Sequence, residues 1–173
     1  MRLDLSKIRS ARERYEKEYD AEAFSDDREL FRVVGPVSLA FDILKDKDQF
    51  HLVGRVKTRL ELPCSRCLEP FTTPVEAAFD LRYVPQSLNA GLDEREIEED
   101  DLSTAYYEND EIDLGQLMRE QFFLALPMKP LCRDDCLGLC PVCGTNLNRG
   151  TCQCKRTWDD PRLAALKSLK RES

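Results

Sequence analysis

Residues 50–62 read Phe50-His-Leu-Val-Gly-Arg-Val-Lys-Thr-Arg-Leu-Glu-Leu62 and decide the fold class. The even positions are apolar, with Gly54 and Thr58 between them; they are Phe50, Leu52, Val56, Leu60 and Leu62. A period of two sends successive side chains to opposite faces of a strand. The stretch therefore predicts a β-strand with one face that another layer must cover.

The flanking segments show the same period. Odd positions are apolar in residues 37–43 and mostly apolar in residues 71–83. The polar turn Asp46-Lys47-Asp48-Gln49 joins the first two strands, and residues 63–70 join the second to the third. Short links between sequential strands favour an antiparallel meander. The pair Cys64 and Cys67 is therefore expected at a hairpin tip.

Residues 114–126 are predicted to form a helix that covers the sheet. Asp113 is the expected N-cap, Gln116 is spaced for a capping box, and Pro127 ends the helix. We interpret Phe122 and Phe123 as core residues and not as a platform for stacked bases.

Two further helices are predicted. Residues 7–23 place apolar side chains at helical spacing behind Ser6 as a possible N-cap. Residues 161–171 follow Asp160 and Pro161, which suit a helix start. The expected fold class is α+β, an antiparallel β-meander covered by one or two helices, with a small C-terminal zinc-binding module.

The charge of the chain is unevenly spread. Its 173 residues carry −7 overall, with residues 1–75 neutral, residues 76–126 at −11 and residues 127–173 at +4. We interpret residues from about 86 to 105 as an acidic loop, with an acidic binding surface as the alternative, and Tyr106-Tyr107 as a short strand. An acidic protein attracts phosphate only through a local cationic cluster.

Composition excludes several classes of protein. His51 is the only histidine, so a His-x-x-x-His zinc protease is excluded. Residues 1–6 carry no apolar signal core, and no window approaches the roughly 18 apolar residues of a membrane span. No serine or histidine stands in a nucleophile–base motif. We therefore expect a cytoplasmic, non-enzymatic protein without a membrane or a small-molecule substrate.

Eight cysteines form four close pairs, and none is left over. The pairs are Cys64/Cys67, Cys132/Cys136, Cys140/Cys143 and Cys152/Cys154. Without a secretory signal, such spacing indicates metal ligands before disulfides, and two pairs complete a tetrahedral Zn²⁺ site. Asn146, Asn148 and Gly150 can turn the loop between the last two pairs. Closed all-cysteine shells are typical of structural zinc, so two Zn²⁺ ions are expected.

Three pairings of these half-sites are possible. We prefer Cys64, Cys67, Cys132 and Cys136 as one site, with the last four cysteines as the other. The alternatives join Cys64/Cys67 to Cys140/Cys143 or to Cys152/Cys154.

Candidate RNA-binding residues follow from strand alternation. Arg55, Lys57 and Arg59 share the face opposite the predicted core, Arg66 lies at the adjacent hairpin tip, and Lys129 and Arg133 flank the first cysteine site. The simpler interpretation is a solvated sheet face.

Several strings resemble the YceD family, whose members are called large ribosomal RNA subunit accumulation proteins. They are Leu62-Pro-Cys-Ser-Arg-Cys-Leu68, Leu126-Pro-Met-Lys-Pro-Leu-Cys132, Cys136-Leu-Gly-Leu-Cys-Pro-Val-Cys143 and Asp160-Pro-Arg-Leu-Ala-Ala-Leu166. The last two of these strings are similar to the longer bacterial members. The resemblance implies a non-enzymatic role in accumulation or processing of 23S ribosomal RNA, and family members with a shorter ligand set support the preferred pairing.

Three functions remain open from the sequence. The first is a factor that binds large-subunit ribosomal RNA or a pre-ribosomal protein. The second is a zinc-ribbon adaptor in transcription or another assembly, and the third, a thiol redox sensor, is disfavoured because no cysteine is unpaired. Residues 1–131 are expected to form the core domain, and residues 132–173 the cysteine-rich module and C-terminal helix.

Overall fold

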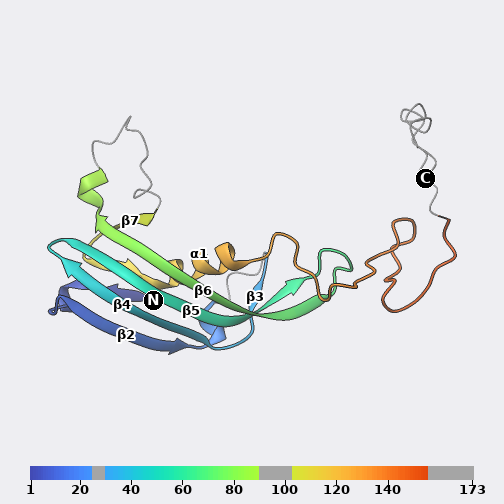
Figure 1. Cartoon of the computed structure of the whole chain (residues 1–173), viewed down its shortest axis with the longest axis horizontal. Helices are drawn as coiled ribbons and strands as arrows, with labels where there is room; N and C mark the ends of the chain where they lie inside the picture. The colour runs from blue at the N-terminus through green and yellow to red at the C-terminus, as the bar shows by residue number, and fades with distance from the viewer. Residues whose placement is uncertain (25–29, 90–102, 156–173) are drawn as a thin grey trace, which may run out of the picture.

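The three alternating segments form the predicted antiparallel meander. The computed structural model describes residues 1–24, 30–89 and 103–155. Its meander consists of β4 (Val37–Asp46), β5 (Gln49–Pro63) and β6 (Pro70–Pro85), joined by hairpins (Figure 1). The first hairpin turns at Lys47, whose φ is 55°, and the second pairs Pro63 with Pro70. The antiparallel register confirms this part of the α+β prediction.

The larger sheet has the order β2-β4-β5-β6-β7, and β3 (Arg32–Val33) pairs with the far part of β5. Its edges are β2 (Arg12–Tyr19) and β7 (Thr104–Tyr107). A two-stranded sheet joins β1 (Arg2–Asp4) to β8 (Glu111–Asp113). Three short 3₁₀ helices are η1 (Leu5–Lys7), η2 (Ala21–Phe24) and η3 (Gln86–Asn89).

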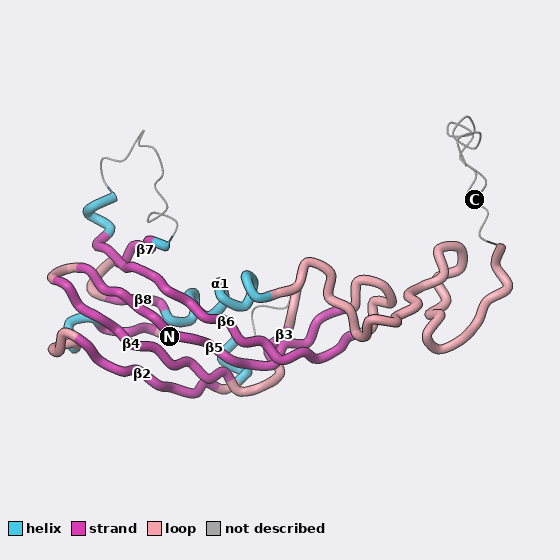
Figure 2. Tube along the Cα trace, in the orientation of Figure 1, coloured by secondary structure: helices cyan, strands magenta, loops and turns pink. Residues whose placement is uncertain are grey.

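One face of the sheet is buried beneath α1 (Leu114–Ala125) and the N-terminal segments (Figure 2). The predicted inward residues of the meander, such as Leu39, Leu52 and Val56, are completely buried. Phe122 is also completely buried and contacts Phe24 and Phe31 edge-on, whereas Phe123 is 47% exposed. The helix therefore covers the sheet as predicted, but only the first of its two phenylalanines is fully a core residue.

The N-cap prediction for α1 is confirmed. The Asp113 carboxylate accepts hydrogen bonds from the backbone N–H groups of Gly115 at 2.8 Å and Gln116 at 3.2 Å. The capping-box prediction is wrong, because the Gln116 amide donates instead to Glu120, one turn further on.

The predicted helix over residues 7–23 is wrong. The segment contains part of η1, the edge strand β2 and η2, and Asp4 rather than Ser6 caps η1. Tyr15 and Tyr19 are four residues apart, a spacing that suits one helix face and equally one strand face. Pairing with β4 and stacking of Tyr15 on Phe41, with ring centroids 4.8 Å apart, select the strand.

The short strand at Tyr106-Tyr107 is confirmed, although its direction is not that of a meander. β7 runs parallel to β6, so the sheet is mixed. Tyr107 donates a hydrogen bond to the carbonyl of Asp48 at 3.0 Å and packs edge-on against Phe50, which fixes the strand at the sheet edge. The predicted helix over 161–171 and residues 90–102 of the predicted acidic loop lie outside the described residues, whereas the start of that loop forms η3 and its end enters β7. Within the described ranges, no helix has the length and apolar character needed to cross a membrane.

Candidate metal centres

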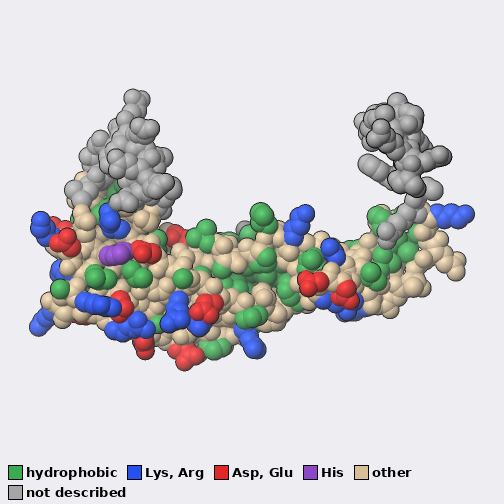
Figure 3. Space-filling view, in the orientation of Figure 1, with side chains coloured by type: hydrophobic (Ala, Val, Ile, Leu, Met, Phe, Trp, Pro, Cys, Tyr) green, Lys and Arg blue, Asp and Glu red, His purple; other side chains and the backbone are tan. Residues whose placement is uncertain are grey.

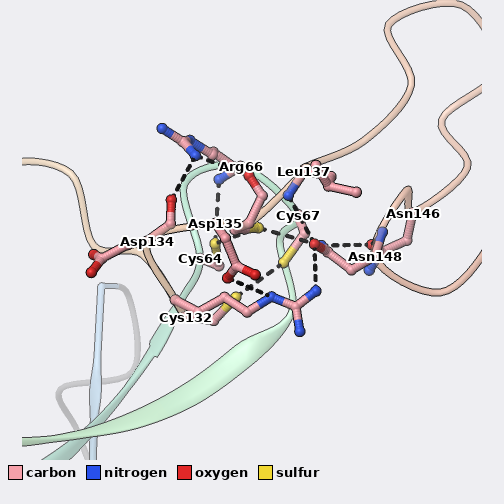
Figure 4. A network of polar contacts seen from close by, with 11 residues as sticks. Cys64, Arg66, Cys67, Cys132, Asp134, Asp135, Leu137, Asn146 and Asn148 are labelled. Atoms are coloured by element: carbon pink, nitrogen blue, oxygen red, sulfur yellow. Dashed lines mark hydrogen bonds and ion pairs between the residues drawn. The ribbon is translucent and has the colours of Figure 1, made fainter.

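The hairpin between β5 and β6 delivers the first cysteine pair. Cys64 and Cys67 meet Cys132 and Cys136, and we call this quartet site one (Figure 4). The Sγ atoms of Cys64 and Cys136 are 3.8 Å apart, as are those of Cys67 and Cys132. The backbone N–H of Ser65 donates to the carbonyl of Pro130 at 2.8 Å, which holds the chain leaving α1 against the hairpin tip.

The local turn chemistry explains how the chain closes around site one. Leu68 adopts a positive φ of 61°, and its N–H donates to the carbonyl of Cys64 at 2.9 Å. Gly138 has a φ of +73°, and a Cβ there would lie 3.0 Å from the carbonyl oxygen of Arg66. Glycine permits both this backbone conformation and the close approach.

The last four cysteines form a second quartet, which we call site two. It contains Cys140, Cys143, Cys152 and Cys154, and it lies nearer the surface than site one. Cys143 is exposed, and its Sγ is 3.2 Å from the Thr145 hydroxyl. The two quartets are the preferred grouping of the four half-sites, and metal ligation by them stays a prediction.

The sulfur geometry suits a tetrahedral metal ion. Bonds of about 2.3 Å to a central zinc ion place the four sulfurs about 3.8 Å apart. The Cys64–Cys136 and Cys67–Cys132 sulfur separations in site one have this value, and all sulfurs within each quartet lie within 4.8 Å of one another. A disulfide would need about 2.05 Å, and all eight thiols are free.

The thiol pKa values in site one diverge strongly. Burial opposes ionisation of Cys64, but backbone N–H groups of Cys132, Cys67 and Arg66 outweigh it and lower the pKa to about 6. Burial, followed by the neighbouring cysteines, raises the pKa of Cys132 to about 12. Four thiolates this close repel one another, and a bound cation would remove that penalty.

Site two shows the same divergence with a different cause. The Thr145 hydroxyl lowers the pKa of Cys143 to about 6, whereas the hydrogen bond with Cys143 leads the causes that raise the pKa of Cys154 to about 12. Each quartet thus contains a thiol with a lowered pKa, which favours the thiolate, beside a thiol with a raised pKa, whose ionisation a bound cation would favour.

Asn148 connects the two sites, a role that the sequence analysis missed when it assigned this residue to a turn. Its side-chain N–H donates to the Cys136 Sγ at 3.3 Å, although Asn148 lies in the loop of site two (Figure 4). Its Oδ1 accepts hydrogen bonds from Arg133 and from the N–H of Leu137, both at 2.8 Å. The Asn148 side-chain N–H also donates to the Oδ1 of Asn146 at 2.9 Å, which holds the Asn148 amide in place. The one signal in the sequence was the pair of asparagines between Cys143 and Cys152. It did not reveal that Asn148 would contact the Cys136 sulfur.

We expect Asn148→Asp to weaken metal retention at site one. The substitution keeps an acceptor for Arg133 and Leu137, but it replaces the donor to Cys136 with a second negative charge. Changes in residues that support metal ligands typically cost about 10–100-fold in affinity. The rate of metal transfer to a chelator measures the effect, with Asn109→Asp, on an exposed turn, as the matched control. Equal rates for the two variants would show that Asn148 does not support site one.

Most cations of the candidate RNA-binding face already form ion pairs with carboxylates of neighbouring strands. Arg55 and Lys57 both contact Glu76, at 3.7 and 2.9 Å, and Arg12 and Arg14 both contact Asp42, at 3.0 and 3.5 Å. His51, on the same face, contacts Asp80 and occupies the surface position predicted for it. Figure 3 shows this face as interspersed blue and red side chains. Arg59 is exposed and, within the described ranges, has no acidic partner.

Two of the remaining candidates support site one directly. The Arg66 guanidinium donates to the carbonyls of Asp134 and Cys136, at 3.2 and 2.9 Å. Arg133 donates to Asn148 and contacts Asp135 at 3.3 Å. Lys129 is exposed beside Met128, which leaves it accessible to a partner.

Comparison with known proteins decides the family. A family model described as large ribosomal RNA subunit accumulation protein YceD matches residues 52–170, which includes both cysteine quartets. The chain belongs to the YceD family. This YceD chain is 30% identical to a chloroplastic YCED homolog 1 of Zea mays, over 69% of its own length and 49% of the relative's.

Other relatives extend the YceD comparison. The corresponding Arabidopsis thaliana homolog is 26% identical over 79% of this chain and 49% of the relative. An uncharacterised Mycobacterium tuberculosis protein is 39% identical over 49% of this chain and 38% of its own length. The chain spans about half the length of the plant relatives. No solved structure gives a significant match.

Proposed function

We propose that this YceD protein is a non-enzymatic factor for the synthesis, processing or accumulation of 23S ribosomal RNA. It acts in the cytoplasm by binding the RNA or a pre-ribosomal protein, and two structural Zn²⁺ ions hold its hairpin tip and C-terminal module. The names of the family and of its plant relatives support the ribosomal role.

The closed cysteine quartets carry the proposal that the protein binds without catalysing. Each quartet supplies four sulfur ligands, which is the full shell of a structural zinc ion, whereas catalytic zinc keeps a position for water. The eight thiolates would hold both ions and leave no coordination site for substrate. The ions would then hold the hairpin tip in a fixed geometry, and the protein would bind its partner through the surface around that tip.

Crosslinking in cells, followed by sequencing of the bound RNA and identification of the bound protein, tests the proposal. Enrichment of 23S ribosomal RNA or of a large-subunit protein is the expected result. Enrichment of neither class, in a strain where the protein is expressed at its normal level, would reject the ribosomal role.

The triple variant Arg55→Gln, Lys57→Gln, Arg59→Gln tests direct RNA contact by the candidate RNA-binding face. We expect an unchanged fold and weaker binding to large-subunit RNA fragments, with the salt slope of log K reduced by roughly 0.7–0.9 for each lost phosphate contact. Lys7→Gln, Arg9→Gln, Lys47→Gln removes the same charge from other exposed positions and serves as the control. Equal binding by the two triple variants would show that this face makes no specific contact with RNA.

The existing ion pairs on the candidate RNA-binding face favour the second candidate function, a zinc-ribbon adaptor between proteins. Because Glu76 and Asp42 each form ion pairs with two cations on that face, phosphate must displace existing ion pairs to bind there. Crosslinking to a protein partner without ribosomal RNA would select the adaptor.

A further inference from the structure

An acidic groove lies at the opposite end of the core from the cysteine sites, where β6, β7, β8 and the start of α1 meet. It encloses about 390 Å³, and its charged lining residues are Arg2, Glu108, Glu111, Asp113 and Glu120. The volume is at the lower end of the roughly 300–1,000 Å³ typical of ligand sites. Apart from Arg2, its lining residues belong to the part of the chain, residues 76–126, that carries −11.

Among the described residues, cations pair with two of these four carboxylates. Arg2 contacts Glu111 at 2.8 Å, and the N-terminal ammonium lies 3.8 Å from Asp113. In the part of the chain that the structure describes, Glu120 receives a neutral donor alone, the Gln116 amide at 2.9 Å. Glu108 has no cationic partner among the described residues. Two negative charges therefore remain for a cation from outside.

Tyr83 supplies a second, independent feature of the groove. It is only 7% exposed, it lines the groove, and its hydroxyl makes no hydrogen bond to any described residue. Burial, with Glu120 and Asp113 adding to it, raises the pKa of Tyr83 to about 12. The hydroxyl thus stays neutral, and its oxygen can accept a hydrogen bond from an incoming cationic group.

A second hollow of about 560 Å³ borders the groove. The two share Tyr107, Glu108 and Asn109, and the second adds the acidic residues Asp48 and Asp110. Two neighbouring acidic hollows suit an extended chain with several cations better than one small ion. It also repels phosphate, which separates this surface from the candidate RNA-binding face.

We propose that the acidic groove binds an extended lysine- and arginine-rich segment of a partner protein, with one cationic side chain held between Glu108, Glu120 and the Tyr83 hydroxyl. Charge complementarity selects this occupant, because the surface offers carboxylates and a hydroxyl acceptor and lacks a spare cation for an acidic ligand. The proposal goes beyond the proposed function and does not depend on RNA binding by the sheet.

Binding of a fluorescein-labelled oligoarginine peptide to the full chain, followed by fluorescence anisotropy at about 0.15 M salt, tests the proposal. We expect Glu108→Gln, Glu120→Gln to weaken binding about tenfold. The matched control Glu16→Gln, Glu18→Gln makes the same change in net charge on β2, at exposed positions, and should change binding less than about twofold.

Tyr83→Phe separates the groove from net charge, since it removes only the hydroxyl. About threefold weaker binding is expected, with a thermal midpoint near that of the wild type. The proposal is overturned if the wild type does not bind the peptide, if the two glutamate pairs behave alike, or if Tyr83→Phe binds as the wild type does. Weaker binding of a labelled single-stranded RNA by the groove variants would also overturn it in favour of an RNA site.

Discussion

Replacing Cys64 by serine will leave the protein with one metal equivalent in place of two. Cys64 is completely buried and its hairpin joins the sheet to the chain that follows α1, so loss of site one frees both. Structural zinc contributes roughly 10–16 kcal/mol in small zinc-binding peptides, enough to decide whether such a region folds. We therefore expect a much lower thermal midpoint than that of the wild type.

Cys152→Ser is the matched comparison. Cys152 is only half-buried and belongs to site two, which organises the outer loop. We expect a smaller fall in midpoint, with a secondary effect on site one through Asn148. Elemental analysis under reducing conditions and thermal unfolding at matched zinc measure both variants. A wild-type content of one zinc or none, or equal destabilisation, would contradict the assignment.

Gly54→Ala is expected to destabilise the sheet by about 3 kcal/mol or more, at the upper end of the overpacking range. Gly54 pairs with Phe41 on β4 and with Phe79 on β6. An added Cβ would lie 2.3 Å from the Cβ of Phe41 and 2.4 Å from the carbonyl oxygen of Ala40. These atoms belong to or adjoin the backbone, so only a shift of the two strands relieves the clash.

Gly150→Ala provides the control, because a Cβ at Gly150 meets no atom within 4 Å. Its free energy of unfolding should lie within about 0.5 kcal/mol of the wild type. Urea unfolding of the zinc-loaded proteins gives both values. A Gly54→Ala midpoint equal to that of Gly150→Ala would show that the two strands separate easily at this point.

Loss of the metal at site one should affect the two proposed interaction surfaces differently. The acidic groove is built from the sheet and α1, whereas Arg66 and Arg133 are held around site one. Loss of site one should therefore reduce any binding that depends on the hairpin tip. Peptide binding in the groove should persist as long as the core remains folded.

Features set by local spacing could be predicted from the sequence. Alternation along residues 37–43, 50–62 and 71–83 determined the three strands, because a period of two with one apolar face is stable only in a covered sheet. Asp113 determined the start of α1 through its side-chain oxygen. The four cysteine pairs determined the half-sites, since each pair needs only a short turn to aim two sulfurs together.

Tertiary structure decided the remainder. Residues 12–19 became a strand because β4 offered an unpaired edge and Phe41 a surface for Tyr15, neither of which local propensity contains. Glu76 and Asp42 formed ion pairs with cations of neighbouring strands on the candidate RNA-binding face, and Asn148 reached a sulfur of the other site. Each of these contacts joins residues distant along the chain, so its energy depends on the register and crossing of whole elements. The spacing of the cysteines along the sequence was therefore enough to predict the metal-binding groups. Only the fold determined which charged side chains have no internal ion pair and can bind a partner.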